Sequence, residues 1–189
     1  MTTRSIINLQ TYPVYLICVV LLLGLIGAGS VNGAIRDPGE HFFHPSFGDL
    51  REELQTAKKS GKKAVLIMFD NHECPWCLKM KTSILNQSHV QDYFREHFQI
   101  IRVDTEGGNP IIDFSGKEML EKDFTLTVNR VRATPVFIFF DLTGKKIVRY
   151  TGAVRNIEEF MWLGEFVVGG HYKSTRFSRY KRTRKAASK

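Results

Sequence analysis

Apolar positions in the first half of the chain switch between helical and strand spacing. Within residues 46–60 the apolar side chains recur every three or four positions, which predicts a helix ending at Gly61. The run 64–69 (AVLIMF) is short and continuously apolar, which is typical of a strand buried on both faces of a sheet. Two helical stretches are predicted after Cys74, and residues 98–103 are predicted to form the next strand.

The second half of the chain continues this alternation. Residues 111–117 predict a short hairpin or ordered loop, and residues 118–128 predict a helix. The remaining predicted elements are a strand over 136–140, a strand over 147–150 joined to it by a Thr143-Gly144 turn, and a last helix over 157–168.

The order of these elements predicts a single α/β domain with a mixed central sheet and helices on both faces. Residues 36–172 have the length of one ordinary domain. Hydrophobic residues make up 43% of the chain and charged residues 24%, values that exclude wholesale disorder and a collagen-like repeat. Three cysteines are too few for a disulfide-stapled scaffold.

The N-terminal part of the chain contains an uncharged apolar run over residues 14–28. This length is typical of a signal-peptide core and falls below the ~20 residues that comfortably span a bilayer. We therefore predict that residues 1–34 are a signal peptide or an N-terminal membrane anchor, and that residues 35–45 are a linker. Either outcome exports the domain to the periplasm or another extracytoplasmic compartment. A signal peptide would give a secreted domain, and an anchor would give one tethered by its N-terminal segment.

The excess of positive charge is confined to the C-terminal tail. The chain has 27 Lys and Arg against 19 Asp and Glu, and residues 173–189 hold eight of the basic side chains and no acidic one. Because it also has few aliphatic residues, the segment 169–189 is predicted to be a disordered basic tail. The tail either stays solvated without a specific partner or binds an anionic surface. For an exported protein, an anionic membrane is favoured over nucleic acid.

The chemistry of the chain centres on Cys74 and Cys77, which enclose Pro75 and Trp76 between a predicted buried strand and a predicted helix. At a helix N-terminus, unpaired backbone N–H groups and the helix dipole stabilise a thiolate, here on Cys74. Cys77 follows one turn later, close enough to form a small disulfide. This context favours thiol–disulfide exchange.

Two cysteines at this spacing could also attach haem, bind zinc or form a structural disulfide. Covalent haem attachment requires a histidine after the second cysteine, where this chain has Leu78, and is excluded. A zinc site of His72, Cys74 and Cys77 lacks an evident fourth ligand. A purely structural disulfide would close a very small loop and contribute little stability. We therefore predict no metal and no cofactor beyond a redox-active disulfide between Cys74 and Cys77.

Several motifs occur in a familiar order: a strand before CPWC, the pair Thr134-Pro135 before the strand VFIFF, the turn LTGKKI, and the later Tyr150-Thr151-Gly152. In this order they resemble the thioredoxin superfamily over residues 46–168. The E-C-P-W-C loop, the passage IIDFSGKEMLEKD and the motif RATPVFIFFD are most similar to the exported SoxW-type thioredoxins of bacteria. The resemblance implies a single thioredoxin-like domain.

The same resemblance implies the roles of the site residues. Cys74 would attack a substrate disulfide, and Cys77 would resolve the mixed disulfide. Pro135 would be a cis-proline facing the cysteines, and the backbone of Thr134 would hold the substrate as an added strand. Two further residues would border the substrate groove, namely Trp76, which otherwise caps the core, and Gly152.

The chain also departs from the familiar thioredoxin pattern. A buried aspartate usually lies six residues before the first cysteine, and Met68 occupies that position here. Asp70 and Glu73 are nearer candidates for a general base, and the alternative for each is a solvated carboxylate at the rim of the site. The extra chain length between CPWC and Pro135 falls in residues 105–123, an insertion that either shapes a partner surface or is an inert elaboration.

The function favoured by these features is an exported thiol–disulfide oxidoreductase that reduces disulfides of envelope proteins. Reduction in an oxidising compartment needs imported electrons, which implies a membrane electron donor of the thiol-transporting type. The first alternative is a disulfide oxidase or isomerase of the same fold. The second alternative is a non-enzymatic thioredoxin-like module that binds a metal or docks a partner.

Overall fold

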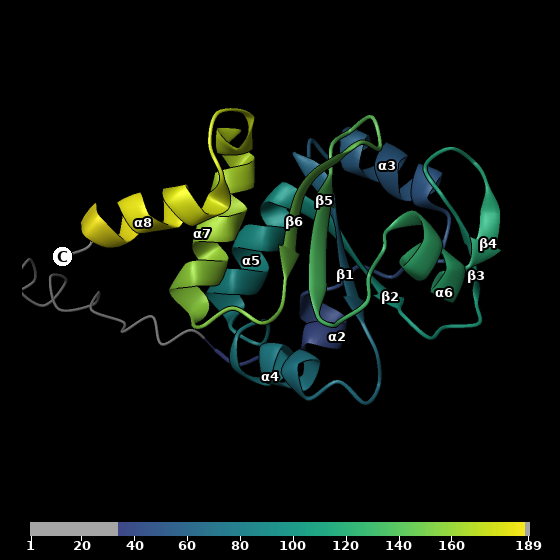
Figure 1. Ribbon diagram of the computed structural model, residues 1–189, viewed down its shortest axis with the longest axis horizontal. Helices are drawn as coiled ribbons and strands as arrows, with labels where there is room; N and C mark the ends of the chain where they lie inside the picture. Colours follow the sequence, from purple (N-terminus) through teal and green to yellow (C-terminus); the bar gives the residue numbers. More distant parts are fainter. Residues whose placement is uncertain (1–33, 188–189) are drawn as a thin grey trace, which may run out of the picture. The chain divides into compact units, whose positions relative to one another are not determined.

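Residues 34–187, which the computed structural model describes, fold around a four-stranded mixed sheet (Figure 1). The predicted signal peptide or anchor lies outside the described residues, except for Ala34. No helix among the described residues is long and apolar enough to cross a membrane. In spatial order the strands of the sheet are β2 (Phe98–Asp104), β1 (Ala64–Asp70), β5 (Val136–Phe140) and β6 (Lys146–Thr151).

Strand β1 lies inside the sheet and pairs in opposite senses with its two neighbours. It runs parallel to β2, with Ile67 opposite Ile101, and antiparallel to β5, with Ile67 opposite Ile138. β6 then runs antiparallel to β5. Every residue of β1 is buried, because helices cover both faces of the sheet. The predicted α/β fold with a mixed central sheet is confirmed.

Alternate residues of β1 contribute to two separate hydrophobic clusters. Leu66 and Met68 face one cluster, and Val65 and Ile67 face the other. The first cluster is covered by α4 (Pro75–Ser83), α5 (Ser88–His97) and α7 (Ile157–Val168), and the second by α3 (Leu50–Lys59) and the segment that begins with α6 (Glu121–Asp123) (Figure 1).

The first long helix begins four residues later than its apolar spacing predicts. Gly48 adopts a left-handed φ of 87°, which a helix does not continue through. Asp49 then caps α3, since its side chain accepts a hydrogen bond of 2.9 Å from the backbone N–H of Arg51. The apolar residue Phe47 is left almost fully exposed.

Residues 35–45, predicted as a linker, pack onto the domain instead. A short helix, α2 (Pro38–His41), leads into Phe42, which is fully buried. The ring centroid of Phe42 lies 5.8 Å from that of Phe94 in α5 and 6.1 Å from that of Phe160 in α7. This aromatic contact makes the segment part of the core.

The predicted hairpin in the insertion is present. β3 (Pro110–Ile112) and β4 (Glu118–Leu120) pair antiparallel, with Ile111 opposite Met119. The predicted helix over 118–128 is therefore wrong in its first turn, because pairing with β3 extends those residues. The helix starts with α6 and continues as a π-helical turn over Phe124–Val128.

The basic tail differs most from its prediction of disorder. Within the described residues it forms a short 3₁₀ turn at His171–Lys173 and an eleven-residue helix, α8 (Phe177–Ala187). Phe177 and Tyr180 place their ring centroids 5.4 Å and 5.3 Å from that of Phe166 in α7. Two ion pairs tie α8 to α7, Lys181 with Glu159 at 2.6 Å and Arg184 with Glu165 at 2.9 Å.

Candidate active site around the Cys74–Cys77 disulfide

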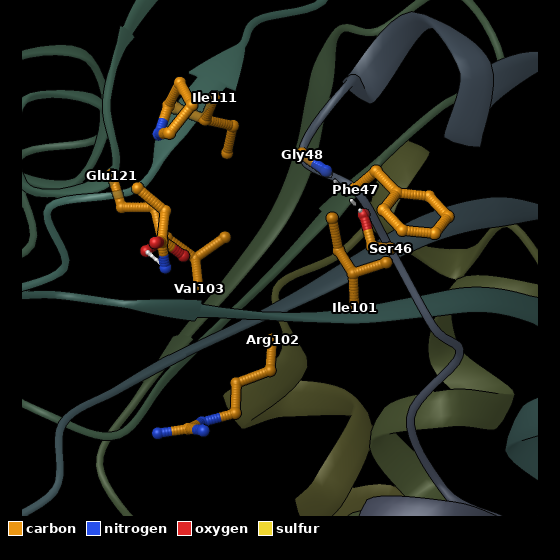
Figure 2. A pocket seen from close by; sticks show the side chains of 10 residues that line it. Ser46, Phe47, Gly48, Ile101, Arg102, Val103, Ile111 and Glu121 are labelled. Atoms are coloured by element: carbon orange, nitrogen blue, oxygen red, sulfur yellow. Dashed lines mark hydrogen bonds between the residues drawn. The ribbon is translucent and has the colours of Figure 1, made fainter.

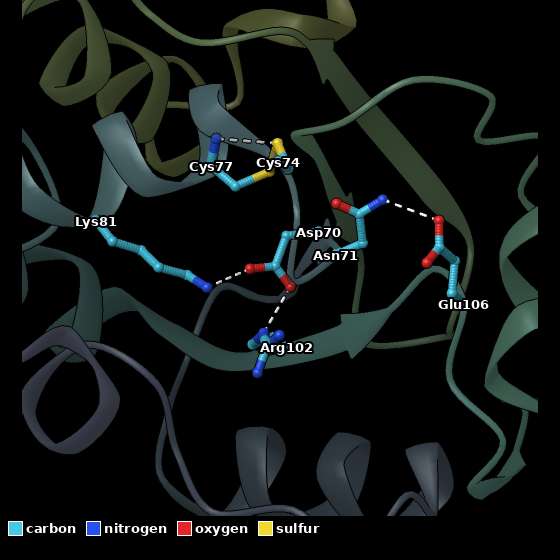
Figure 3. The surroundings of a disulfide bond; sticks show 7 residues. All are labelled: Asp70, Asn71, Cys74, Cys77, Lys81, Arg102 and Glu106. Atoms are coloured by element: carbon cyan, nitrogen blue, oxygen red, sulfur yellow. Dashed lines mark hydrogen bonds and ion pairs between the residues drawn. A yellow bond between two sulfur atoms is a disulfide. The ribbon is translucent and has the colours of Figure 1, made fainter.

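Cys74 and Cys77 form a disulfide at the N-terminus of α4 (Figure 3). Cys74 is the N-cap residue, and its Sγ accepts a hydrogen bond of 3.0 Å from the backbone N–H of Cys77. Pro75 occupies the first helical turn, where its missing N–H costs no helical hydrogen bond. Cys74 is 8% exposed and Cys77 only 1%. Both cysteines are thus buried, and Cys74 is the more exposed of the two.

The Thr134–Pro135 peptide bond is cis, as predicted. Phe69 of β1 lies opposite Val136 of β5, so Pro135 lies next to the end of β1, from which the chain leads to Cys74. The carbonyl of Pro135 accepts a hydrogen bond of 2.8 Å from the N–H of Gly152. Gly152 has a φ of 94°, a value that favours glycine.

Trp76 does not cap the core. Its side chain is 58% exposed, and the Nζ of Lys79 lies 5.2 Å from the centroid of its ring. Leu78 on the same helix is also largely exposed. These two apolar side chains therefore give the surface beside the disulfide an uncovered apolar area.

The interpretation of Asp70 as a solvated rim carboxylate is wrong. Asp70 ends β1 on the same face as Met68 and is completely buried. One carboxylate oxygen pairs with the Nζ of Lys81, and the other accepts a hydrogen bond of 2.5 Å from the Nε of Arg102 (Figure 3). Burial is tolerated here because both oxygens face cations. Glu73, in contrast, is exposed and fits the solvated interpretation.

Met68 occupies a fully apolar setting. It is completely buried in the same hydrophobic cluster as Cys74 and Cys77. A buried carboxylate lies instead two residues further along β1, at Asp70, where it meets Arg102 of β2 across the strand pair.

A pocket of about 510 Å³ opens beside the disulfide. Both cysteines line it, together with the two cations that hold Asp70, Lys81 and Arg102. A second pocket, of about 360 Å³, is lined by Thr134 of the cis-proline loop and by residues of the insertion. Asn71 lines both pockets, so the two adjoin at this residue.

A further pocket lies between β2 and the β3–β4 hairpin and does not include the cysteines (Figure 2). Its lining includes Glu121 and the exposed Phe47. The side chain of Arg102 points away from the other labelled residues. Glu121 accepts hydrogen bonds from the backbone N–H of Asp104 and from Asn109. These carboxylate contacts hold the insertion against β2.

Sequence reasoning missed three residues of the site, namely Asn71, Lys81 and Arg102. Two of them left a signal in the sequence. Lys81 lies one helical turn after Cys77 and thus on the same face of the helix. Arg102 is the only charge within the apolar run of the second strand, before its terminal aspartate.

Within residues 34–187, no group of three or more His, Cys, Asp or Glu side chains is arranged to hold a metal ion. His72, the third residue of the zinc alternative, is exposed.

The sheet, the disulfide at a helix N-terminus and the adjacent cis-proline define a thioredoxin-type site. The chain belongs to the family described as the thioredoxin-like domain, whose model matches residues 50–167.

Individual relatives are more distant. The disulfide bond reductase DsbH of Chlamydia pneumoniae is 27% identical over 99 residues, which cover 52% of this chain and 57% of that protein. The match thus spans little more than half the length of this curated relative. A thioredoxin-fold protein from Helicobacter pylori is similar in structure, with a TM-score of 0.55 and 22% identity over 67% of this chain and 87% of its own. A putative disulphide-isomerase from Bacteroides thetaiotaomicron has a TM-score of 0.51 and 22% identity over 72% and 94%. At 22% identity, these structural similarities show a shared fold.

Proposed function

We propose that this protein is a thiol–disulfide oxidoreductase whose redox centre is the Cys74–Cys77 disulfide. The observation that carries the proposal is the position of this disulfide, at the N-terminus of α4 and on the wall of an open pocket. A helix N-terminus stabilises the thiolate that forms when the disulfide is reduced.

The reaction proceeds through two exchanges. The Cys74 thiolate attacks one sulfur of a substrate disulfide, so that a Cys74–substrate bond forms, the substrate bond breaks and one substrate thiolate leaves. The Cys77 thiolate then attacks the sulfur of Cys74, which restores the intramolecular disulfide and releases the second substrate thiol. The substrate gains two electrons and the protein loses two. The greater exposure of Cys74 supports its role as the attacking residue.

The substrate is held beside the cis-proline. The backbone of Thr134 pairs with an extended substrate segment, and the cis-proline Pro135 faces the cysteines. Gly152, which is hydrogen-bonded to Pro135, has no side chain that could obstruct this segment, and the exposed Trp76 of the CPWC loop offers apolar area.

The direction of electron flow in this proposal is reduction of the substrate. The name of the Chlamydia pneumoniae relative, a disulfide bond reductase, supports this direction, as does the resemblance of the E-C-P-W-C loop to SoxW-type thioredoxins.

The two carboxylates considered as general bases differ in this scheme. Asp70 is buried with both carboxylate oxygens facing cations, whereas Glu73 faces solvent and lines the pocket of the disulfide.

The cellular setting follows from the N-terminal sequence. The uncharged run over residues 14–28 supports an exported, periplasmic protein that acts on disulfides of envelope proteins. Repeated reduction there requires an electron donor in the membrane of the thiol-transporting type, which would reduce the Cys74–Cys77 disulfide after each turnover.

Helix α8 supplies a surface for an anionic membrane. Arg176, Arg179 and Arg182 line one pocket together with Ser and Thr hydroxyls, and no carboxylate of the described residues lines it. Lys181 and Arg184 pair with carboxylates of α7, whereas these three arginines form no ion pair with a carboxylate within residues 34–187. Cations exposed in this way are attracted to anionic headgroups.

A trapping experiment tests the exchange mechanism. Reduced Cys77→Ser protein, incubated with a disulfide-bonded protein such as insulin, is expected to accumulate a mixed disulfide through Cys74 that dithiothreitol releases. Cys74→Ser protein is the matched control and should form no such adduct, because the buried Cys77 is poorly accessible. Absence of the adduct with Cys77→Ser, or trapping through Cys77 instead, would contradict the proposal.

A further inference from the structure

Asn71 joins the two pockets of the site. It follows the buried Asp70 at the end of β1 and precedes the loop to Cys74. The pocket on one side of Asn71 contains the disulfide, and the pocket on the other side contains Thr134. A substrate segment that pairs with Thr134 and presents its cysteine to Cys74 therefore passes beside Asn71.

The orientation of the Asn71 amide is determined by a carboxylate of the insertion. Its Nδ2 donates a hydrogen bond of 3.1 Å to Oε1 of Glu106. An ionised carboxylate only accepts hydrogen bonds, so the NH₂ group must face Glu106 and the oxygen must face away from it. Figure 3 shows the amide oxygen of Asn71 on the side of the disulfide and the nitrogen on the side of Glu106.

The oxygen that is oriented in this way has no partner among the described residues. Oδ1 of Asn71 is buried and accepts no hydrogen bond from them. A buried acceptor without a partner is costly, and native structures contain few of them. Asn71 as a whole is half-buried and lines both pockets, so the backbone of a substrate that occupies them lies beside its amide.

We propose that Oδ1 of Asn71 accepts a hydrogen bond from a backbone N–H of an extended protein substrate, next to the substrate's reacting cysteine. Glu106 is a positioning residue that holds the amide in the accepting orientation. The site thereby prefers disulfides within polypeptide segments to small disulfides that carry no backbone N–H. This role of Asn71 rests on the proposed exchange function and gives a purpose to the first residues of the insertion.

The test compares two disulfides of different kinds. The second-order rate constant of the reduced protein is measured with insulin and with 4,4′-dithiodipyridine, which has no N–H or O–H donor. Asn71→Ala is expected to slow the reaction with insulin about tenfold, near the upper limit for one neutral hydrogen bond. The reaction with 4,4′-dithiodipyridine should stay within about twofold of wild type, because that disulfide cannot donate to the amide.

Two variants of Glu106 test the orientation. Glu106→Gln keeps an acceptor for Nδ2 of Asn71 but also gains an NH₂ donor, so it is expected to slow the insulin reaction less than Glu106→Ala does. Glu106→Ala lets the amide rotate and should slow only the insulin reaction, by about threefold. An equal loss with both disulfides, or an unchanged insulin rate in Asn71→Ala, overturns the inference. Trapping by Cys77→Ser is independent of Asn71, so a failed inference remains distinguishable from a failed proposed function.

Discussion

At the scale of single residues, the charge around the disulfide is unusual because a fully buried carboxylate is shared by two cations. Asp70 lies between Lys81 and Arg102, and both cations line the pocket that contains Cys74 and Cys77. The cluster carries one net positive charge. A positive charge near the Cys74–Cys77 disulfide stabilises the thiolate of the reduced form. It therefore favours reduction of this disulfide and raises its reduction potential.

We expect opposite effects on the reduction potential when this cluster is altered. Lys81→Met removes a cation and should lower the potential by about 15–30 mV at pH 8, whereas Asp70→Asn removes the negative charge and should raise it by a similar amount. The potential is measured by equilibration in glutathione buffers. Lys79→Met is the matched control, since Lys79 lies on the same helix but is exposed. Shifts of the same sign for Lys81→Met and Asp70→Asn contradict this electrostatic effect.

His44 makes folding stability depend on pH. Burial and the nearby Arg95 lower the pKa of His44 from 6.5 to about 4, and Nδ1 of the ring accepts a hydrogen bond of 3.0 Å from the N–H of Ile100. Because the folded-state pKa is lowered, the neutral ring contributes stability above pH 6.5, and this contribution is lost as the pH falls toward 4.

Urea unfolding at pH 7 and pH 5 tests this expectation. When the pH is lowered from 7 to 5, the free energy of unfolding should fall by about 1 kcal/mol more in wild type than in His44→Gln. This value allows for the partial solvent exposure of the ring. His89→Gln serves as the control for removal of an unrelated histidine. If wild type and His44→Gln lose the same free energy, the ring is not held neutral by the fold.

At the scale of elements, α8 is held by an apolar contact as well as by charge. Phe177 and Tyr180 pack against Phe166 of α7, and Phe177 also lies 5.9 Å from Tyr150 between ring centroids. Phe177→Ala should therefore lower the free energy of unfolding by about 1–2 kcal/mol, less than a fully buried phenylalanine would cost. Arg179→Ala, on the exposed side of the same helix, should change it by less than about 0.5 kcal/mol. Equal stability of Phe177→Ala and wild type in urea would mean that α8 does not dock in solution.

The elements that the sequence predicts well are those with a strong local pattern. The continuous apolar runs at β1 and β5 and the helical spacing of α7 need no knowledge of their neighbours. The sequence misplaces Glu118–Leu120 in a helix, because the pairing of this segment with β3 is a tertiary contact. The prediction of disorder for the basic tail is wrong because the aromatic surface that receives it includes Phe166 of α7, a contact that the composition of the tail does not encode.

The same distinction holds within the site. Cys74, Cys77 and the cis bond before Pro135 follow from short motifs, and the structure places them as expected. The contact between Asp70 and Arg102 depends on the register of β1 against β2, which no local pattern encodes. Local motifs thus predict the reacting groups, whereas their electrostatic surroundings require the fold.

At the scale of the whole molecule, α8 and the turn before it carry the arginines proposed to face an anionic membrane. Binding of the full chain is measured with vesicles of neutral lipid and with vesicles that contain about 30% anionic headgroups. The gain in affinity on the anionic vesicles is the part of the binding that depends on charge. The gain in affinity on the anionic vesicles should fall at least tenfold when Arg176, Arg179 and Arg182 are all changed to Gln, since each cation contributes about 1 kcal/mol.

The control for this experiment removes the same charge elsewhere. Lys58, Lys59 and Lys63 are exposed around the end of α3, and changing all three to Gln should leave most of the gain intact. The gain should also shrink as salt is raised, because screening weakens exposed charges. An equal loss in both triple variants would show that only net charge matters and that α8 is not a docking surface.

The reduction potential of the Cys74–Cys77 pair in the wild-type chain tests the proposed function most directly. Equilibration in dithiothreitol or glutathione buffers is expected to give a value near the roughly −270 mV typical of thioredoxin, which suits a protein that reduces its substrates. A value near about −120 mV would contradict reduction and indicate a disulfide donor. A value well below about −300 mV, without exchange with insulin, would mean that the disulfide is structural and would contradict the oxidoreductase function itself.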